Sequence, residues 1–115
     1  MAKYAEAETV LLRGLELDPG SADGHYELAK TYWALGRWQD AETHARKAVT
    51  LKPDLAGAHV LVGDIALHKR DAQGALREYR QALRLDSKGP MAAATQQMVE
   101  KIEQALRQPP PKGAN

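Results

Sequence analysis

The apolar positions of this chain recur at helical spacing in several segments that are separated by short polar breaks. Between residues 38 and 51, and again between 72 and 85, small and aliphatic side chains fall on one stripe, three or four residues apart. No run alternates apolar and polar residues around a hairpin dipeptide, and Leu, Ala, Glu and Arg greatly outnumber Val and Ile. The pattern therefore predicts an all-α protein.

Breaks that contain Gly, Pro or Asp, such as "DPGSAD" and "KPDLAG", divide the chain into six segments. Connections this short place consecutive helices antiparallel to one another. The six helices are expected at about residues 4–17, 22–35, 38–51, 56–68, 72–85 and 90–107.

The segments repeat with a fixed period. The tripeptide Ala-Glu-Thr begins at Ala7 and again at Ala41, and Pro19 recurs as Pro53, so both pairs are 34 residues apart. A fixed period of this size is typical of stacked repeats, in which one helical hairpin alone would leave an apolar flank in water. Stacking of successive hairpins is therefore expected to build the core.

These residues resemble the tetratricopeptide repeat (TPR) family, whose 34-residue unit is a helix-turn-helix. The best copy is residues 22–55, and the copy at 56–89 has Arg70 where the first has the turn glycine Gly36, and Ser87 where the first has the closing proline. The signature positions of the best copy are Leu28, Ala29, Tyr32, Gly36, Trp38, Ala41, Ala48, Leu51 and Pro53. At the second turn, Arg70 leaves the geometry in question.

The resemblance implies a TPR-type right-handed α-solenoid of antiparallel helical hairpins. Residues 1–107 are expected to form the TPR domain, with 4–21 as the second half of a unit, 22–55 and 56–89 as full units, and 90–107 as a capping helix. Consecutive prolines in "QPPPKGAN" cannot continue a helix, so residues 108–115 are expected to form a disordered Pro-rich tail.

In TPR arrays the first helix of each unit lines a concave surface. Carried onto this chain, the resemblance implies a largely apolar, peptide-binding groove with a few polar fixing points, suited to an extended or helical segment of a partner protein. In the alternative interpretation, Trp33 and the Met side chains only fill core between helices. The nominated groove residues are Asp23, Tyr26, Lys30, Trp33, Val60, Asp64, Leu67, Met91 and Met98.

One TPR specialisation grips the C-terminal carboxylate of chaperone tails with Lys, Asn and Arg on successive first helices. Here Tyr26, Val60, Leu61 and Asp64 stand where those basic and amide groups would be needed. No recognition of a chaperone tail is therefore expected.

The helix at 4–17 has no preceding partner helix within this sequence, and the outer half of the helix at 90–107 is expected to project. Both features favour an alternative function, a self-associating structural or assembly module, and a homo-oligomer as partner. The residues expected to carry self-association are Tyr4, Val10, Leu11, Ile102 and Leu106.

Composition and charge mainly exclude other functions. The net charge is +1, and Glu42, Glu78 and Asp86 interleave the cationic side chains of Arg46, Lys47, Arg77, Arg80 and Arg84, so a solvated face is expected rather than a nucleic-acid site. No apolar run approaches the roughly 20 residues that span a bilayer, so no membrane insertion is expected, and without a signal peptide the default location is cytoplasmic.

Catalytic and metal-binding motifs are also missing from the sequence. His25 and His59 occupy equivalent repeat positions but lack a third ligand at a suitable spacing, and no phosphate loop or nucleophile elbow is present. The chain is therefore expected to be non-enzymatic, without a metal or another cofactor.

Overall fold

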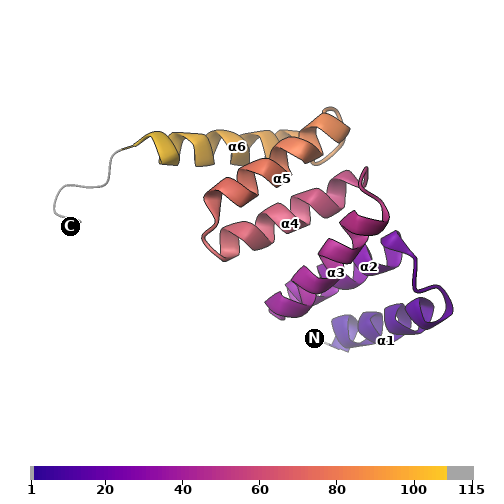
Figure 1. Cartoon of the computed structure of the whole chain (residues 1–115). Coiled ribbons are helices and arrows are strands. Elements are labelled where there is room, and N and C mark those ends of the chain that lie inside the picture. Colours follow the sequence, from indigo (N-terminus) through magenta and orange to yellow (C-terminus); the bar gives the residue numbers. More distant parts are fainter. Residues whose placement is uncertain (1, 109–115) are drawn as a thin grey trace.

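The computed structural model describes residues 2–108, which fold into six helices with no strand in that range (Figure 1). Their bounds lie within two residues of the predicted segments, so the all-α prediction is confirmed. The predicted Pro-rich tail lies outside the described residues apart from Gln108. The helices are α1 (Ala2–Leu17), α2 (Ala22–Ala34), α3 (Trp38–Leu51), α4 (Ala56–His68), α5 (Ala72–Leu85) and α6 (Ala92–Arg107).

Helix starts follow local capping chemistry in two of these elements. The Ser21 side chain accepts a 2.9 Å hydrogen bond from the Gly24 amide at the start of α2, and the Asp71 side chain accepts one of 2.9 Å from the Gly74 amide at the start of α5. Each bond satisfies an amide that has no partner inside its helix.

The turns that end α2 and α4 have the same geometry although their residues differ. Gly36 has φ +77° and Arg70 has φ +63°, both in the left-handed region. Arg37 N donates to Tyr32 O at 2.9 Å, and its counterpart Asp71 N donates to Ala66 O at 2.8 Å. The turn therefore persists at Arg70, where a side chain occupies a conformation that glycine adopts without strain.

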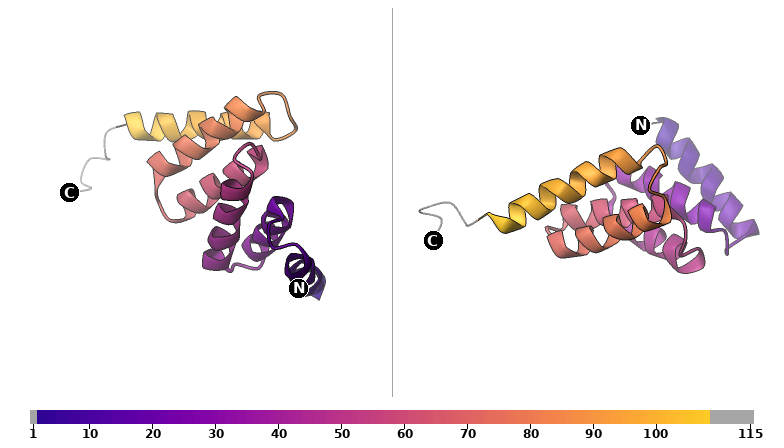
Figure 2. Two further views of the ribbon diagram at one scale, coloured as in Figure 1. Left: turned by 45° about the vertical axis from the view of Figure 1, so that its right-hand side comes forward. Right: turned by 90° about the horizontal axis from the view of Figure 1, so that it is seen from above.

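Each helix packs mainly against its neighbours in the sequence, so the fold is a stack with α1 and α6 at opposite ends (Figures 1 and 2). The radius of gyration is 15.8 Å, compared with about 13 Å for a compact domain of this length. Two buried clusters form the core, one around Leu28, Tyr32 and Ile65, and the other around Tyr79, Val99 and Ile102.

Candidate functional site

Helices α2 and α4, the first helices of their units, carry most of the predicted groove residues at exposed or partly exposed positions. Asp23 and Lys30 are exposed, whereas Tyr26 and Trp33 are half-buried against the first core cluster. On α4 and α6, Val60, Leu67 and Met98 all pack against the second core cluster while keeping part of their surface in solvent. The structure thus divides the apolar members between two clusters.

Tyr26 links three of the elements expected to form the groove. A Cβ atom added at Gly57 would lie 2.4 Å from the Tyr26 hydroxyl and 3.3 Å from the Met91 Cε, so α2, α4 and the residue that precedes α6 meet here. Lys30 Nζ lies 4.5 Å from the centre of the Tyr26 ring and 3.0 Å from Glu27 Oε1. Burial raises the pKa of Tyr26 despite the nearby Lys30 charge, so its hydroxyl stays protonated.

An aromatic cluster joins the ends of α2 and α4 to the start of α3. The Trp33 and Trp38 ring centres are 4.8 Å apart with an edge-on orientation, and Trp38 lies 4.4 Å from the His68 ring. Trp38 is therefore engaged in packing, although 38% of it remains exposed.

Asp64 differs from the free fixing point that the sequence suggested. Its carboxylate accepts a hydrogen bond from the Tyr79 hydroxyl of α5. Burial raises the pKa of Asp64, and this hydrogen bond partly offsets the rise. The carboxylate thus helps to hold α4 against α5, which leaves it less available to a ligand.

The two repeat histidines lie in separate networks. His25 Nε2 is 2.9 Å from Pro19 O and His59 Nε2 is 2.7 Å from Pro53 O, so each ring donates to the loop before its helix. His25 Nδ1 meets His44 Nδ1 at 3.0 Å, whereas His59 Nδ1 meets Glu78 Oε1 at 2.8 Å. Among residues 2–108 no group of three or more His, Cys, Asp or Glu is arranged to hold a metal ion.

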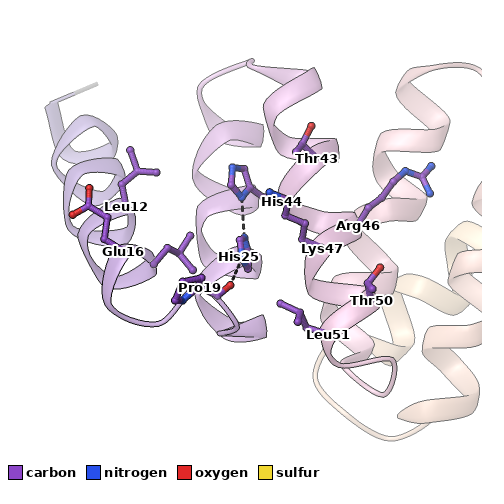
Figure 3. Close-up of a pocket in the computed structure, with 11 residues that line it drawn as sticks. Leu12, Glu16, Pro19, His25, Thr43, His44, Arg46, Lys47, Thr50 and Leu51 are labelled. Carbon is purple, nitrogen blue, oxygen red and sulfur yellow. Dashed lines mark hydrogen bonds between the residues drawn. The ribbon is translucent and has the colours of Figure 1, made fainter.

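A hollow of about 700 Å³, which the sequence analysis missed, opens between α1 and α3 (Figure 3). His25 and His44 line it together with Leu12, Leu15 and Leu51, and it shares no residue with the predicted groove. The available signal was Leu12, which occupies the repeat position that Arg46 occupies in the next unit.

Two cationic side chains of α3 and α5 are paired with carboxylates, and a third bonds to an amide. Arg46 Nη2 lies 3.0 Å from Glu42 Oε2, Arg80 bonds to Glu103, and Arg84 Nη2 lies 2.6 Å from Gln81 Oε1. This pairing favours the expected solvated face over a nucleic-acid site.

The residues predicted for self-association differ in their exposure to solvent. Val10 is 70% exposed and Tyr4 is 42% exposed, whereas Leu11 is half-buried against the first core cluster. At the other end, Leu106 is 47% exposed, but the prediction for Ile102 is wrong. Ile102 is buried in the second core cluster, because the inner stripe of α6 extends further along α5 than expected.

The fold and the paired helices define the class of protein: an all-α TPR solenoid. The tetratricopeptide repeat family model matches residues 1–56 and 26–90, so the chain belongs to the tetratricopeptide repeat family. It is 32% identical over 85 residues to RNA polymerase II-associated protein 3 of Xenopus laevis, covering 74% of this chain and 13% of that protein. The chain therefore spans only a small part of this relative.

Two solved structures show how closely the fold is shared. The first TPR of Spaghetti (RPAP3) bound to the HSP90 peptide SRMEEVD matches with TM-score 0.82 and 25% identity over 93% of this chain and 82% of that chain. PcrH in complex with the chaperone binding region of PopD matches with TM-score 0.82 and 18% identity over 91% of this chain and 82% of that chain. None of the helices within residues 2–108 combines the length and apolar character needed to cross a bilayer.

Proposed function

We propose that this chain is a non-enzymatic interaction module that binds a segment of a partner protein on the surface formed by α2, α4 and α6. The observation that carries the proposal is the series of half-buried apolar side chains on the first helices of successive units. Such side chains are fixed by the core and still offer area to a ligand, so little conformational freedom is lost on binding. The anchors are Tyr26, Trp33, Val60, Leu67 and Met98.

The similarity to an RPAP3 domain bound to a peptide supports the binding of a peptide segment. The acidic chaperone tail itself is a poor match for this chain. Leu61, at one of the positions where a tail-binding side chain would be needed, is only 5% exposed, and Asp64 places a carboxyl group where a cation would be required. The proposed ligand is therefore an amphipathic segment whose apolar side chains contact the anchors.

Selection of displayed peptides against the protein would test the proposal. Trp33→Ala should weaken the selected peptides about tenfold or more, since buried aromatic anchors dominate binding energy. Leu85→Ala is the control, because Leu85 is an apolar side chain that lies on α5, outside the proposed surface, and is 36% exposed. Equal affinity of the wild type and the Trp33 variant for every selected peptide would reject this surface.

The peptide SRMEEVD provides a second control. No binding is expected at concentrations that saturate the selected peptides. Tight binding of this peptide that is abolished by Lys30→Ala would contradict the assignment and would indicate a chaperone-tail site.

Self-association through α1 is a second candidate function, favoured by the exposure of Val10 at 70% and Leu17 at 89%. It predicts a concentration-dependent mass in light scattering that Val10→Glu abolishes and Leu106→Glu leaves unchanged. A strict monomer at high concentration would remove this candidate.

A further inference from the structure

The hollow between α1 and α3 has a much smaller counterpart one repeat later. The second space, between α3 and α5, has a volume of about 180 Å³ and is lined by Arg46, Val49, Thr50, Val62 and Glu78. The first has a volume of about 700 Å³, within the range of about 300–1,000 Å³ that is typical of small-molecule sites. The interval between α1 and α3, the first interval, therefore has an open hollow of ligand size, whereas the interval between α3 and α5, the second interval, has a smaller one.

The difference arises from side chains at equivalent repeat positions. Leu12 replaces the longer Arg46, and His44 replaces Glu78. In the second interval the carboxylate of Glu78 lies 2.8 Å from His59 Nδ1, so an anion partners the imidazole. In the first interval an imidazole meets another imidazole, because His44 occupies the position at which the second interval has the Glu78 carboxylate.

The contact with Pro19 fixes one of the imidazole protons. Pro19 O can only accept, so His25 Nε2 carries the hydrogen. When both rings are neutral, His25 accepts at Nδ1 from His44 Nδ1–H, so Nε2 is the His44 nitrogen that gains a hydrogen when His44 takes up a second proton. Lys47, one helical turn after His44, adds an exposed cation to the same wall (Figure 3).

We propose that this hollow binds a small amphipathic carboxylic acid. Its apolar body lies against Leu12, Leu15 and Leu51, and its carboxylate is held by His44 and Lys47. The ligand supplies to the first interval the anion that Glu78 supplies to the second. The site is independent of the surface proposed for the partner segment, because it is built from α1, α3 and the start of α2.

Charge around His44 sets the expected pH dependence of binding. Burial, then His25 and then Lys47, lower the pKa of His44, while Asp40 opposes them. Glu16 of α1 and Arg46 of α3 also line the hollow, and Arg46 is paired with Glu42. A bound carboxylate favours protonated His44, so binding takes up a proton and strengthens as the pH falls from about 8 to about 6.

Titration with sodium octanoate, followed by amide chemical shifts, tests the site directly. Saturable shifts are expected in residues 12–19 and 43–51, with little change in α5 and α6. Octanol and octylammonium, which match the apolar chain, should bind about tenfold more weakly because they lack the anion. Shifts that never saturate, or equal binding of octylammonium, would overturn the proposal.

Variants that copy the second interval provide the matched test. His44→Glu places a carboxylate in the hollow and Leu12→Arg fills it, so each should weaken octanoate about tenfold or more, and Lys47→Ala should weaken it about threefold. Arg77→Ala removes an exposed cation from α5 and should leave the affinity unchanged. If one variant fails to fold, the other decides, and wild-type affinity in a folded His44→Glu or Leu12→Arg protein would refute the site.

Discussion

The repeat units at 22–55 and 56–89 build the same helical hairpin from different packing solutions. Between α2 and α3, the buried pair is Ala29 and Ala45, both fully excluded from solvent. At the equivalent positions between α4 and α5, the pair is Gly63 and Tyr79, and a Cβ at position 63 would lie 2.7 Å from the Tyr79 ring. In the first unit both positions carry a methyl group, whereas in the second unit one position has no side chain and the other carries a large aromatic ring.

The two units also differ in how their polar groups are bonded. The large ring in the second unit carries a hydroxyl, which donates to Asp64, while Lys30 at the equivalent position in the first unit remains at the surface. In the first unit the aromatic side chain is instead Tyr32, whose hydroxyl donates to Glu8 Oε2 of α1 at 2.7 Å. The two units therefore form the same hairpin although the buried tyrosine and its carboxylate partner occupy different positions.

The largest expected effect comes from removing the aromatic side chain of the second unit. Tyr79→Ala should lower the free energy of unfolding by about 3–5 kcal/mol, since it leaves a cavity and removes the donor to Asp64. Tyr79 is 1% exposed, whereas the control Tyr4→Ala changes a ring that is 42% exposed and should cost far less. Urea unfolding followed by circular dichroism measures both.

The close approach of Gly63 to the Tyr79 ring can be tested by substituting the glycine. Gly63→Ala should cost about 1–3 kcal/mol in stability, because its Cβ overlaps the buried Tyr79 ring. In a Tyr79→Ala background the same change should become neutral or stabilising, because alanine favours helix and the overlap is gone. Additive effects in this double-mutant cycle would mean that position 63 and the Tyr79 ring do not interact.

The two turns offer a smaller effect of opposite sign. Arg70→Gly should raise the free energy of unfolding by about 0.5–1 kcal/mol, because glycine adopts a positive φ without the steric cost that Arg70 bears. Gly36→Arg is the reverse experiment and should destabilise by a similar amount. A loss of stability in Arg70→Gly would show that the Arg70 side chain contributes more than its backbone strain costs.

The smallest expected effect is a pH-dependent one at the histidine networks. Because the pKa of His44 is lowered in the folded protein from 6.5, the unfolded chain binds more protons near that pH. The stability contributed by neutral His44 is thus fully present above about pH 6.5, and it is lost as the pH falls through the pKa that His44 has in the folded protein.

His44→Glu should remove that loss and reproduce the His59–Glu78 arrangement. The variant should gain stability relative to the wild type as the pH falls from about 8 to about 6, by about 1 kcal/mol or less for a partly exposed pair. The comparison of unfolding curves across this pH range checks it. An identical pH dependence in both proteins would mean that the pKa of His44 is the same in the folded and unfolded states.

Much of the architecture could be predicted because helical periodicity and the breaks are local signals. The helix bounds follow from spacing along the chain, and the turn at Gly36 follows from the resemblance to the repeat family. The burial of Ile102 could not be predicted, since the apolar stripe of α6 does not show how far along it α5 packs. The groove residues remain a prediction from the repeat register, and the structure adds that Asp64 is engaged by Tyr79.

The sequence by itself determined the period, the six helices and the stacked hairpin class, because each depends on residue spacing and on turn residues within one unit. Only the tertiary structure decided which charges are paired, which apolar side chains are covered, and that the hollow between α1 and α3 is much larger than the one between α3 and α5. These features depend on side chains from helices separated in the chain, where a single exchange such as Leu12 for Arg46 changes the space that remains.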